Sequence, residues 1–164
     1  MKTKALSFCT KILSFFLILL GFQSCEKRGG RTTCCEYGVP SATFKVKGKV
    51  QDSETGKPVK DIRAVLVKMH SNTPDEKMES IYETDTVYTN AAGEFDASIN
   101  SFPENNVEFK VKFADIDGDE NGKYESKDIE VIFDNPKYEG KSGNWYSGET
   151  TKNIETINLE SVKE

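Results

Sequence analysis

Hydrophobic and polar residues alternate one by one along much of the chain after Thr43. A period of two places successive side chains on opposite faces, as in a β-strand with one buried face. No window shows the 3.6-residue apolar repeat of an amphipathic helix. The alternating runs place the following residues on common faces: Phe44, Val46, Gly48 and Val50; Ile62, Ala64 and Leu66; Tyr82, Thr84, Thr86 and Tyr88; Phe95, Ala97 and Ile99; Val107, Phe109, Val111 and Phe113; Ile129, Val131 and Phe133; and Ile157 and Leu159.

Short runs rich in Gly, Asn, Asp and Pro separate the alternating segments, as turns do. Residues 52–57 and 90–93 are predicted turns, and 71–78 is a predicted polar loop around Pro74. Short strands at this spacing are typical of two packed antiparallel sheets. The pattern therefore predicts an all-β fold, a single antiparallel β-sandwich of about seven strands over residues 43–164.

Residues 1–24 form a segment of a different kind. Lysines at 2, 4 and 11 accompany an apolar run over 12–22, which is shorter than the roughly 20 residues of a membrane-spanning helix. A positive head, a short apolar middle and a small residue, Ser24, before Cys25 are typical of a lipoprotein signal peptide. Cleavage before Cys25 is the prediction, and the alternative is a secreted protein in which Cys25 is incidental.

Lipid on Cys25 predicts a membrane anchor. We expect a diacylglyceryl group on the thiol and an acyl chain such as palmitate on the new N-terminus, and several chains together anchor a protein stably. Residues 25–42 lack hydrophobic periodicity and read as a flexible tether. Some surface-directed bacterial lipoproteins carry an acidic cluster after the lipidated cysteine. Here Glu26 is followed by bases at 27, 28 and 31, which favours a periplasm-facing anchor in the outer membrane.

Charge narrows the classes of partner. Removal of residues 1–24, which hold three lysines and no acidic residue, leaves 19 basic and 27 acidic residues and a formal charge of −8. An acidic domain lacks the positive patch that nucleic acid requires, and anionic headgroups would repel it. We therefore expect no nucleic acid partner and attachment to the membrane through the lipid.

Two adjacent cysteines lie in the tether. Cys34 and Cys35 are the cysteines left once Cys9 is removed with the signal and Cys25 carries lipid. Neighbouring cysteines pair with each other only through a strained ring. Together with Tyr37 they are candidates for modification or recognition, and the alternative is a passive linker that packs on the domain.

Several segments resemble the carboxypeptidase regulatory-like, transthyretin-like domain: GKVQD at 48–52, TGKPV at 55–59, TN at 89–90 and GEF at 93–95. The pattern has a physical basis, because Gly56 permits a tight turn and Gly93 turns the chain before Phe95 enters the core. The resemblance implies a transthyretin-like sandwich. It implies little about function, because such folds serve many roles.

A second resemblance covers the whole mature chain. The lipoprotein signal, YGVPSA at 37–42, TFKVKGKV at 43–50 and DIDG at 115–118 resemble the lipoproteins associated with radical SAM enzymes. These are short envelope lipoproteins encoded beside a cytoplasmic radical SAM protein. The resemblance implies a maturation substrate or pathway partner of such an enzyme.

The loop between the predicted strands at 107–113 and 129–133 has the spacing of a calcium loop. Acids or amides stand at the first, third, fifth and twelfth positions and Gly122 at the sixth, as hard oxygen ligands and a sharp bend require. The alternative is a solvated hairpin loop rich in turn residues. The candidate Ca²⁺ ligands are Asp117, Asp119, Asn121, Lys123 and Asp128.

Three aromatic residues, Tyr138, Trp145 and Tyr146, lie in a Gly-rich stretch over 135–150. Exposed aromatics on such loops stack on sugar rings or anchor protein partners. The alternative is that the Trp closes one end of the core. These residues are candidate contacts to a glycan or an envelope protein.

The chain lacks the sequence signatures of common enzyme sites. His70 is the one histidine, which excludes metal sites that need two imidazoles, and no nucleophile elbow or phosphate-binding loop occurs. We therefore expect a non-catalytic binding, structural or accessory module of the cell envelope. The alternatives are a calcium-stabilised adhesion or glycan-binding module and a hydrolase with an unrecognised carboxylate site.

Overall fold

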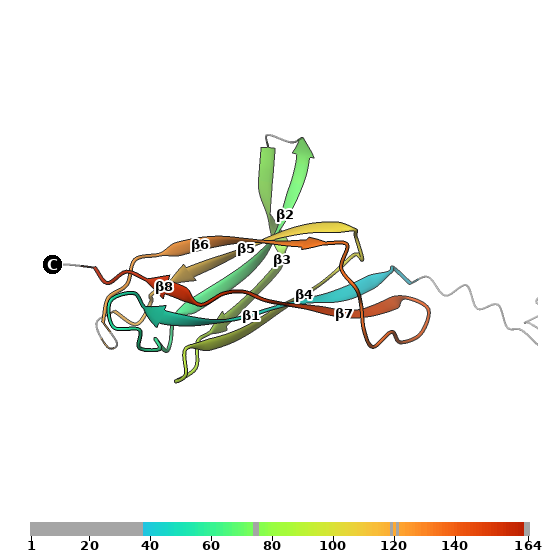
Figure 1. Ribbon diagram of the computed structural model, residues 1–164. Helices are drawn as coiled ribbons and strands as arrows, with labels where there is room; N and C mark the ends of the chain where they lie inside the picture. The colour runs from blue at the N-terminus through green and yellow to red at the C-terminus, as the bar shows by residue number, and fades with distance from the viewer. Residues whose placement is uncertain (1–37, 74–75, 119, 121, 163–164) are drawn as a thin grey trace, which may run out of the picture. The chain divides into compact units, whose positions relative to one another are not determined.

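The computed structural model describes residues 38–73, 76–118, 120 and 122–162, which contain eight β-strands and no helix (Figure 1). The all-β prediction is confirmed, and the described residues contain no helix that could span a membrane. The strands are β1 (Ser41–Asp52), β2 (Arg63–Thr73), β3 (Glu76–Tyr88), β4 (Glu94–Ser101), β5 (Asn106–Ala114), β6 (Lys127–Asp134), β7 (Tyr146–Asn153) and β8 (Ile157–Leu159).

The strands form two sheets. In the first, β1 lies between antiparallel β4 and parallel β7, and the short β8 pairs in parallel with the end of β1. The prediction of a wholly antiparallel arrangement is therefore wrong for this sheet. The second sheet is antiparallel in the order β3-β2-β5-β6. β1 begins at Ser41, two residues before the predicted start of the domain, because Ser41 already pairs with Tyr146 of β7.

The predicted apolar faces of β1, β2, β4, β5 and β6 meet between the two sheets. The predicted face of β3 is wrong: Tyr82 and Tyr88 are exposed, and Val87 on the opposite face packs against the core. The ring of Phe44 in β1 lies 5.3 Å from those of both Phe109 and Phe133 in the second sheet, and Phe95 lies 5.3 Å from Phe113. Such aromatic pairs contribute about 0.5–1.5 kcal/mol each beyond the area that they bury. Strict alternation of burial along β4 and β5 confirms the period-two prediction for these strands.

The prediction of a polar loop over 71–78 is wrong. β2 continues to Thr73 and β3 starts at Glu76, so most of this stretch is a hairpin. Beyond Lys68 no further pairing joins β2 to β5 in the described chain, and the two strands extend as an arm that rises above the sheet (Figure 1). Polar side chains are expected on such an arm because neither of its faces covers the core.

The stretch 135–150 is only partly loop, since β7 begins at Tyr146. Gly148 is the buried residue of β7. A larger residue does not fit there, because an added Cβ would lie 2.2 Å from the carbonyl oxygen of Glu139. A strand with a glycine in its buried position shows no hydrophobic alternation, which explains why the pattern did not predict β7.

Candidate functional site

The chain enters the domain beside Trp145. The indole covers Gly38 so closely that an added Cβ would lie 2.3 Å from its ring, and the Ser41 amide donates a 2.7 Å hydrogen bond to the Trp145 carbonyl. The predicted lipidation site, Cys25, and the candidate modification residues, Cys34, Cys35 and Tyr37, lie outside the described residues.

The three candidate ligand-contact aromatics all contact the domain itself. The ring of Tyr138 stands edge-on to Phe44 at 5.8 Å, and its hydroxyl donates a 3.2 Å hydrogen bond to the Glu104 carbonyl. Burial, together with the Glu104 charge, raises the pKa of Tyr138. The Tyr146 hydroxyl lies 2.9 Å from the Thr43 hydroxyl. These contacts close the end of the domain at which β1 begins.

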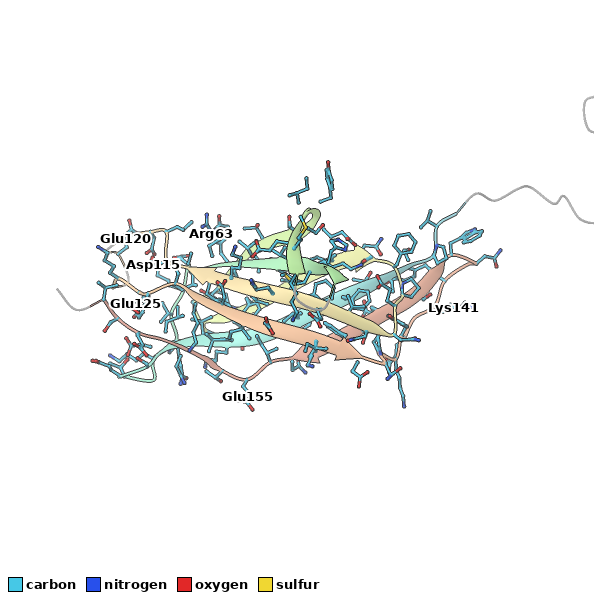
Figure 2. The ribbon with its side chains drawn as sticks, turned by 90° about the horizontal axis from the view of Figure 1, so that it is seen from above. Arg63, Asp115, Glu120, Glu125, Lys141 and Glu155 are labelled. Atoms are coloured by element: carbon cyan, nitrogen blue, oxygen red, sulfur yellow. The ribbon has the colours of Figure 1, made fainter. Side chains whose placement is uncertain are left out.

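The predicted calcium loop lies at the other end of the domain, where Figure 2 labels Asp115, Glu120 and Glu125 far from Lys141. Partial burial raises the pKa of Asp117, and the carboxylates of Asp115, Glu120 and Asp61 raise it further. Asp117 therefore stands among like charges that a cation would relieve.

The other candidate ligands are dispersed or not described. Asp128 lies in β6 opposite Lys112, and the Lys123 carbonyl accepts a 2.8 Å hydrogen bond from the Val162 amide. Asp119 and Asn121 lie outside the described residues. Among the residues that are described, no three His, Cys, Asp or Glu side chains form a metal-binding group.

A buried lysine that the sequence analysis did not single out lies where β2 leaves β5. The ammonium of Lys68 donates hydrogen bonds to the Ser101 hydroxyl at 2.7 Å and to Glu104 at 2.8 Å, and it lies 3.5 Å from Glu83. Ser101 also donates a hydrogen bond to Glu83, which lies 3.1 Å from His70. The two-residue period could have predicted that Lys68 points inward, because Lys68 falls on the same face as Ile62, Ala64 and Leu66.

A hollow of about 620 Å³ lies at the edge of the described domain. We call it the Tyr88 hollow; residues 47–49 of β1, 87–88 of β3, 94–96 of β4 and the 153–156 stretch contribute to its lining. Gly48 keeps it open, because an added Cβ would lie 2.9 Å from both Phe95 and Ile154. Its volume lies within the usual range for small-ligand sites.

The lining of the Tyr88 hollow combines one exposed ring with polar groups. Tyr88 is 52% exposed, and Lys47 and Asp96 form a 2.7 Å ion pair beside it. Asn90, also in the lining, is held by its side-chain oxygen, which accepts the amide hydrogens of Ala92 and Glu94. A ring beside amide and charged groups suits a ligand with one apolar face and several hydroxyls, such as a sugar.

No protein-family model and no curated protein matches this chain. Among solved structures, the C-terminal domain of the shaft pilin spaA from Lactobacillus rhamnosus GG is similar at 10% identity and a TM-score of 0.42, over 73% of this chain and 98% of that one. A 9R-lipoxygenase from Cyanothece PCC8801 is similar at 19% identity and a TM-score of 0.35, over 82% of this chain and 18% of that one. Neither likeness bears on function.

Proposed function

We propose that this chain is a lipid-anchored, non-catalytic module of the cell envelope that binds a polar ligand of the glycan type in the Tyr88 hollow. The hollow carries the binding part of the proposal, because it has the volume of a small-ligand site and places an exposed ring among fixed polar groups. The signal peptide and Cys25 carry the anchoring part.

The path of the chain supports this arrangement. Ser41 is the sixteenth residue after Cys25, so the tether spans at most about 55 Å between the membrane and the start of β1. Lys47, in the lining of the hollow, lies a further six residues along β1, or about 20 Å. The hollow is thus set back from the end that carries the tether, in a periplasm-facing module of the outer membrane.

The domain type and the partner enzyme follow from the two resemblances. The proposal of a transthyretin-like domain is supported by the turns at Gly56 and Gly93, which have positive φ values of 68° and 75°. The proposal that a radical SAM enzyme modifies the chain points to Cys34, Cys35 and Tyr37, which immediately precede the entry at Gly38.

The anchor is tested by mass spectrometry of the native protein from its own envelope. We expect a mature N-terminus at Cys25 that carries lipid, and a further mass change on Cys34, Cys35 or Tyr37. A chain that starts elsewhere, or that lacks lipid, contradicts the anchor. An unmodified tether contradicts the role of a maturation substrate and leaves the anchor intact.

Ligand binding is tested with an array of bacterial envelope glycans and two matched variants of β3. Tyr88→Ala removes the ring of the hollow, whereas Tyr82→Ala removes a tyrosine that is 88% exposed and does not line it. We expect the wild type and Tyr82→Ala to retain the same glycans and Tyr88→Ala to lose them. Equal binding by both variants, or no binding by the wild type, would overturn the assignment of this hollow.

Calcium binding at the acidic loop is a second candidate function. The observation in its favour is the raised pKa of Asp117 beside Asp115, Glu120 and Asp61. A divalent cation neutralises such a group and stabilises the loop. A calcium-dependent rise in the melting temperature that Asp117→Asn abolishes is the expected result, and an unresponsive wild type would exclude it.

A further inference from the structure

A second hollow, of about 470 Å³, lies on the sheet formed by β3, β2, β5 and β6. We call it the Arg63 hollow. Val65 and Val67 of β2, with Ala114 of β5, give it an apolar lining, and Ile81 of β3 adds a further aliphatic group. Ile81 is 78% exposed, which is unusual for an isoleucine and leaves its side chain available to a ligand.

A bulge in β3 places Ile81 there. Between the pairs Val67–Thr84 and Met69–Glu79, β3 advances five residues while β2 advances two, so β3 holds three extra residues. The buried Ser80 hydroxyl accepts hydrogen bonds from the Tyr82 and Glu83 amides at 3.3 and 3.0 Å, which fixes the bulge. Bulges of this kind re-aim side chains at functional sites.

Two basic and two acidic side chains line the Arg63 hollow: Arg63, Lys112, Glu79 and Asp128. Lys112 is paired with Glu79 at 3.0 Å and faces Asp128 across the strands. The Nε of Arg63 is buried and has no hydrogen-bond acceptor among the described residues. Figure 2 shows Asp115 and Glu120 at the same end of the domain as Arg63. A buried guanidinium N–H without an acceptor is unfavourable, and a carboxylate is the acceptor that a guanidinium binds with two parallel hydrogen bonds.

We propose that the Arg63 hollow binds an aliphatic carboxylate, with the anionic group on Arg63 and the hydrocarbon chain on Val65, Val67, Ala114 and Ile81. The two parts of the site indicate the ligand class, because the apolar lining favours hydrocarbon and the buried Nε–H of Arg63, which has no acceptor among the described residues, favours a planar anion. The site is separate from the Tyr88 hollow and does not depend on a glycan being bound there.

The test uses the full lipidated chain in lipid nanodiscs with labelled methyl groups, titrated with 4-methylpentanoate and with its neutral isostere 4-methylpentanamide. We expect saturable shifts of the Val65, Val67, Ala114 and Ile81 methyls with the acid. The amide, which lacks the charge-assisted hydrogen bonds, should bind about tenfold more weakly. Equal affinity for acid and amide, or no shift of these methyls, would overturn the proposal without any variant.

Variants locate the anion. Arg63→Gln should weaken the acid about tenfold and leave the amide unchanged, whereas Lys141→Gln, which removes an exposed charge at the opposite end, should change neither. An unchanged titration of Arg63→Gln with the acid would refute the assignment. If Arg63→Gln does not fold, the comparison of acid with amide on the wild type still decides.

Discussion

Replacement of Lys68 by methionine tests whether the buried ion cluster stabilises the domain. Methionine keeps most of the aliphatic length of the side chain and removes the ammonium group. The change deletes the hydrogen bonds to Ser101 at 2.7 Å and Glu104 at 2.8 Å and the 3.5 Å ion pair with Glu83. It leaves two carboxylates without their common cation.

The exposure of the two carboxylates sets the size of the effect. Breaking a fully buried ion pair costs about 3–5 kcal/mol, because one charge stays buried and uncompensated. Here the Glu104 side chain is 50% exposed and that of Glu83 24% exposed, so both recover part of their hydration. We therefore expect Lys68→Met to lower the free energy of unfolding by about 2 kcal/mol. In a domain of this size the melting temperature should fall by roughly 8 °C.

Urea unfolding of a double-mutant cycle with Glu83→Gln measures the interaction. We expect Lys68→Met to be less costly in the Glu83→Gln background, with a coupling of about 1 kcal/mol, because the uncompensated carboxylate is then absent. Lys141→Met, at an exposed lysine, is the control and should leave stability unchanged within about 0.5 kcal/mol. A Lys68→Met protein as stable as the wild type would show that desolvation of the cluster outweighs its ion pairs, and would refute the reasoning.

Three further predictions concern two glycines with positive φ and two aspartates with shifted pKa values. Gly140 has a φ of 74° and open space around it, so Gly140→Ala should lower the free energy of unfolding in urea by about 1 kcal/mol. In Gly148→Ala the new Cβ would lie 2.2 Å from the Glu139 carbonyl oxygen, so the loss should be at least about 2 kcal/mol greater. Hydrogen bonds from the Thr55 amide and hydroxyl and from the Glu54 amide lower the pKa of Asp52, so its stabilising effect is present above the unfolded pKa of about 3.9 and is lost as the pH falls through the folded value. Thermal melts should therefore show a steeper loss of stability below pH 4 for the wild type than for Asp52→Asn, and parallel curves would contradict this role. For Asp117, whose pKa is raised, the sign is opposite: without calcium, Asp117→Asn should be more stable than the wild type at pH 7, and the difference should vanish as the pH falls below about 3.9.

The strands of the core could be predicted because each has one buried and one solvated face. Phe109 and Val111 in β5 alternate with half-buried lysines, so the local pattern already contains the tertiary information. The same reasoning placed Ile157 and Leu159, which are buried in β8 although that strand has three residues. Burial on one face produces an alternating pattern in the sequence even when the partner strand is distant in the chain.

The remaining features depend on contacts between segments that are remote in sequence. Lys68 falls on an inward face by period, but its partner Ser101 comes from the end of β4, 33 residues away, and no local pattern identifies it. The contact of Trp145 could not be predicted from the local sequence either. Its residue type and Gly-rich context predict either an exposed ligand contact or the closure of the core. Its contact with Gly38 depends on two segments that are remote in sequence and adjacent in the fold.

The buried cluster and the exposed bulge of β3 are two consequences of one arrangement. Glu83 is held inward by Ser101, Lys68 and His70, and Ser80 is held inward by the amides of the bulge itself. With both flanking residues fixed toward the domain, Ile81 and Tyr82 have no inward position left and extend into solvent. The buried ion cluster at Glu83 and the Ser80 turn therefore lie on either side of the exposed Ile81. Core packing alone does not explain an exposed isoleucine, and the proposed ligand of the Arg63 hollow would give Ile81 a contact.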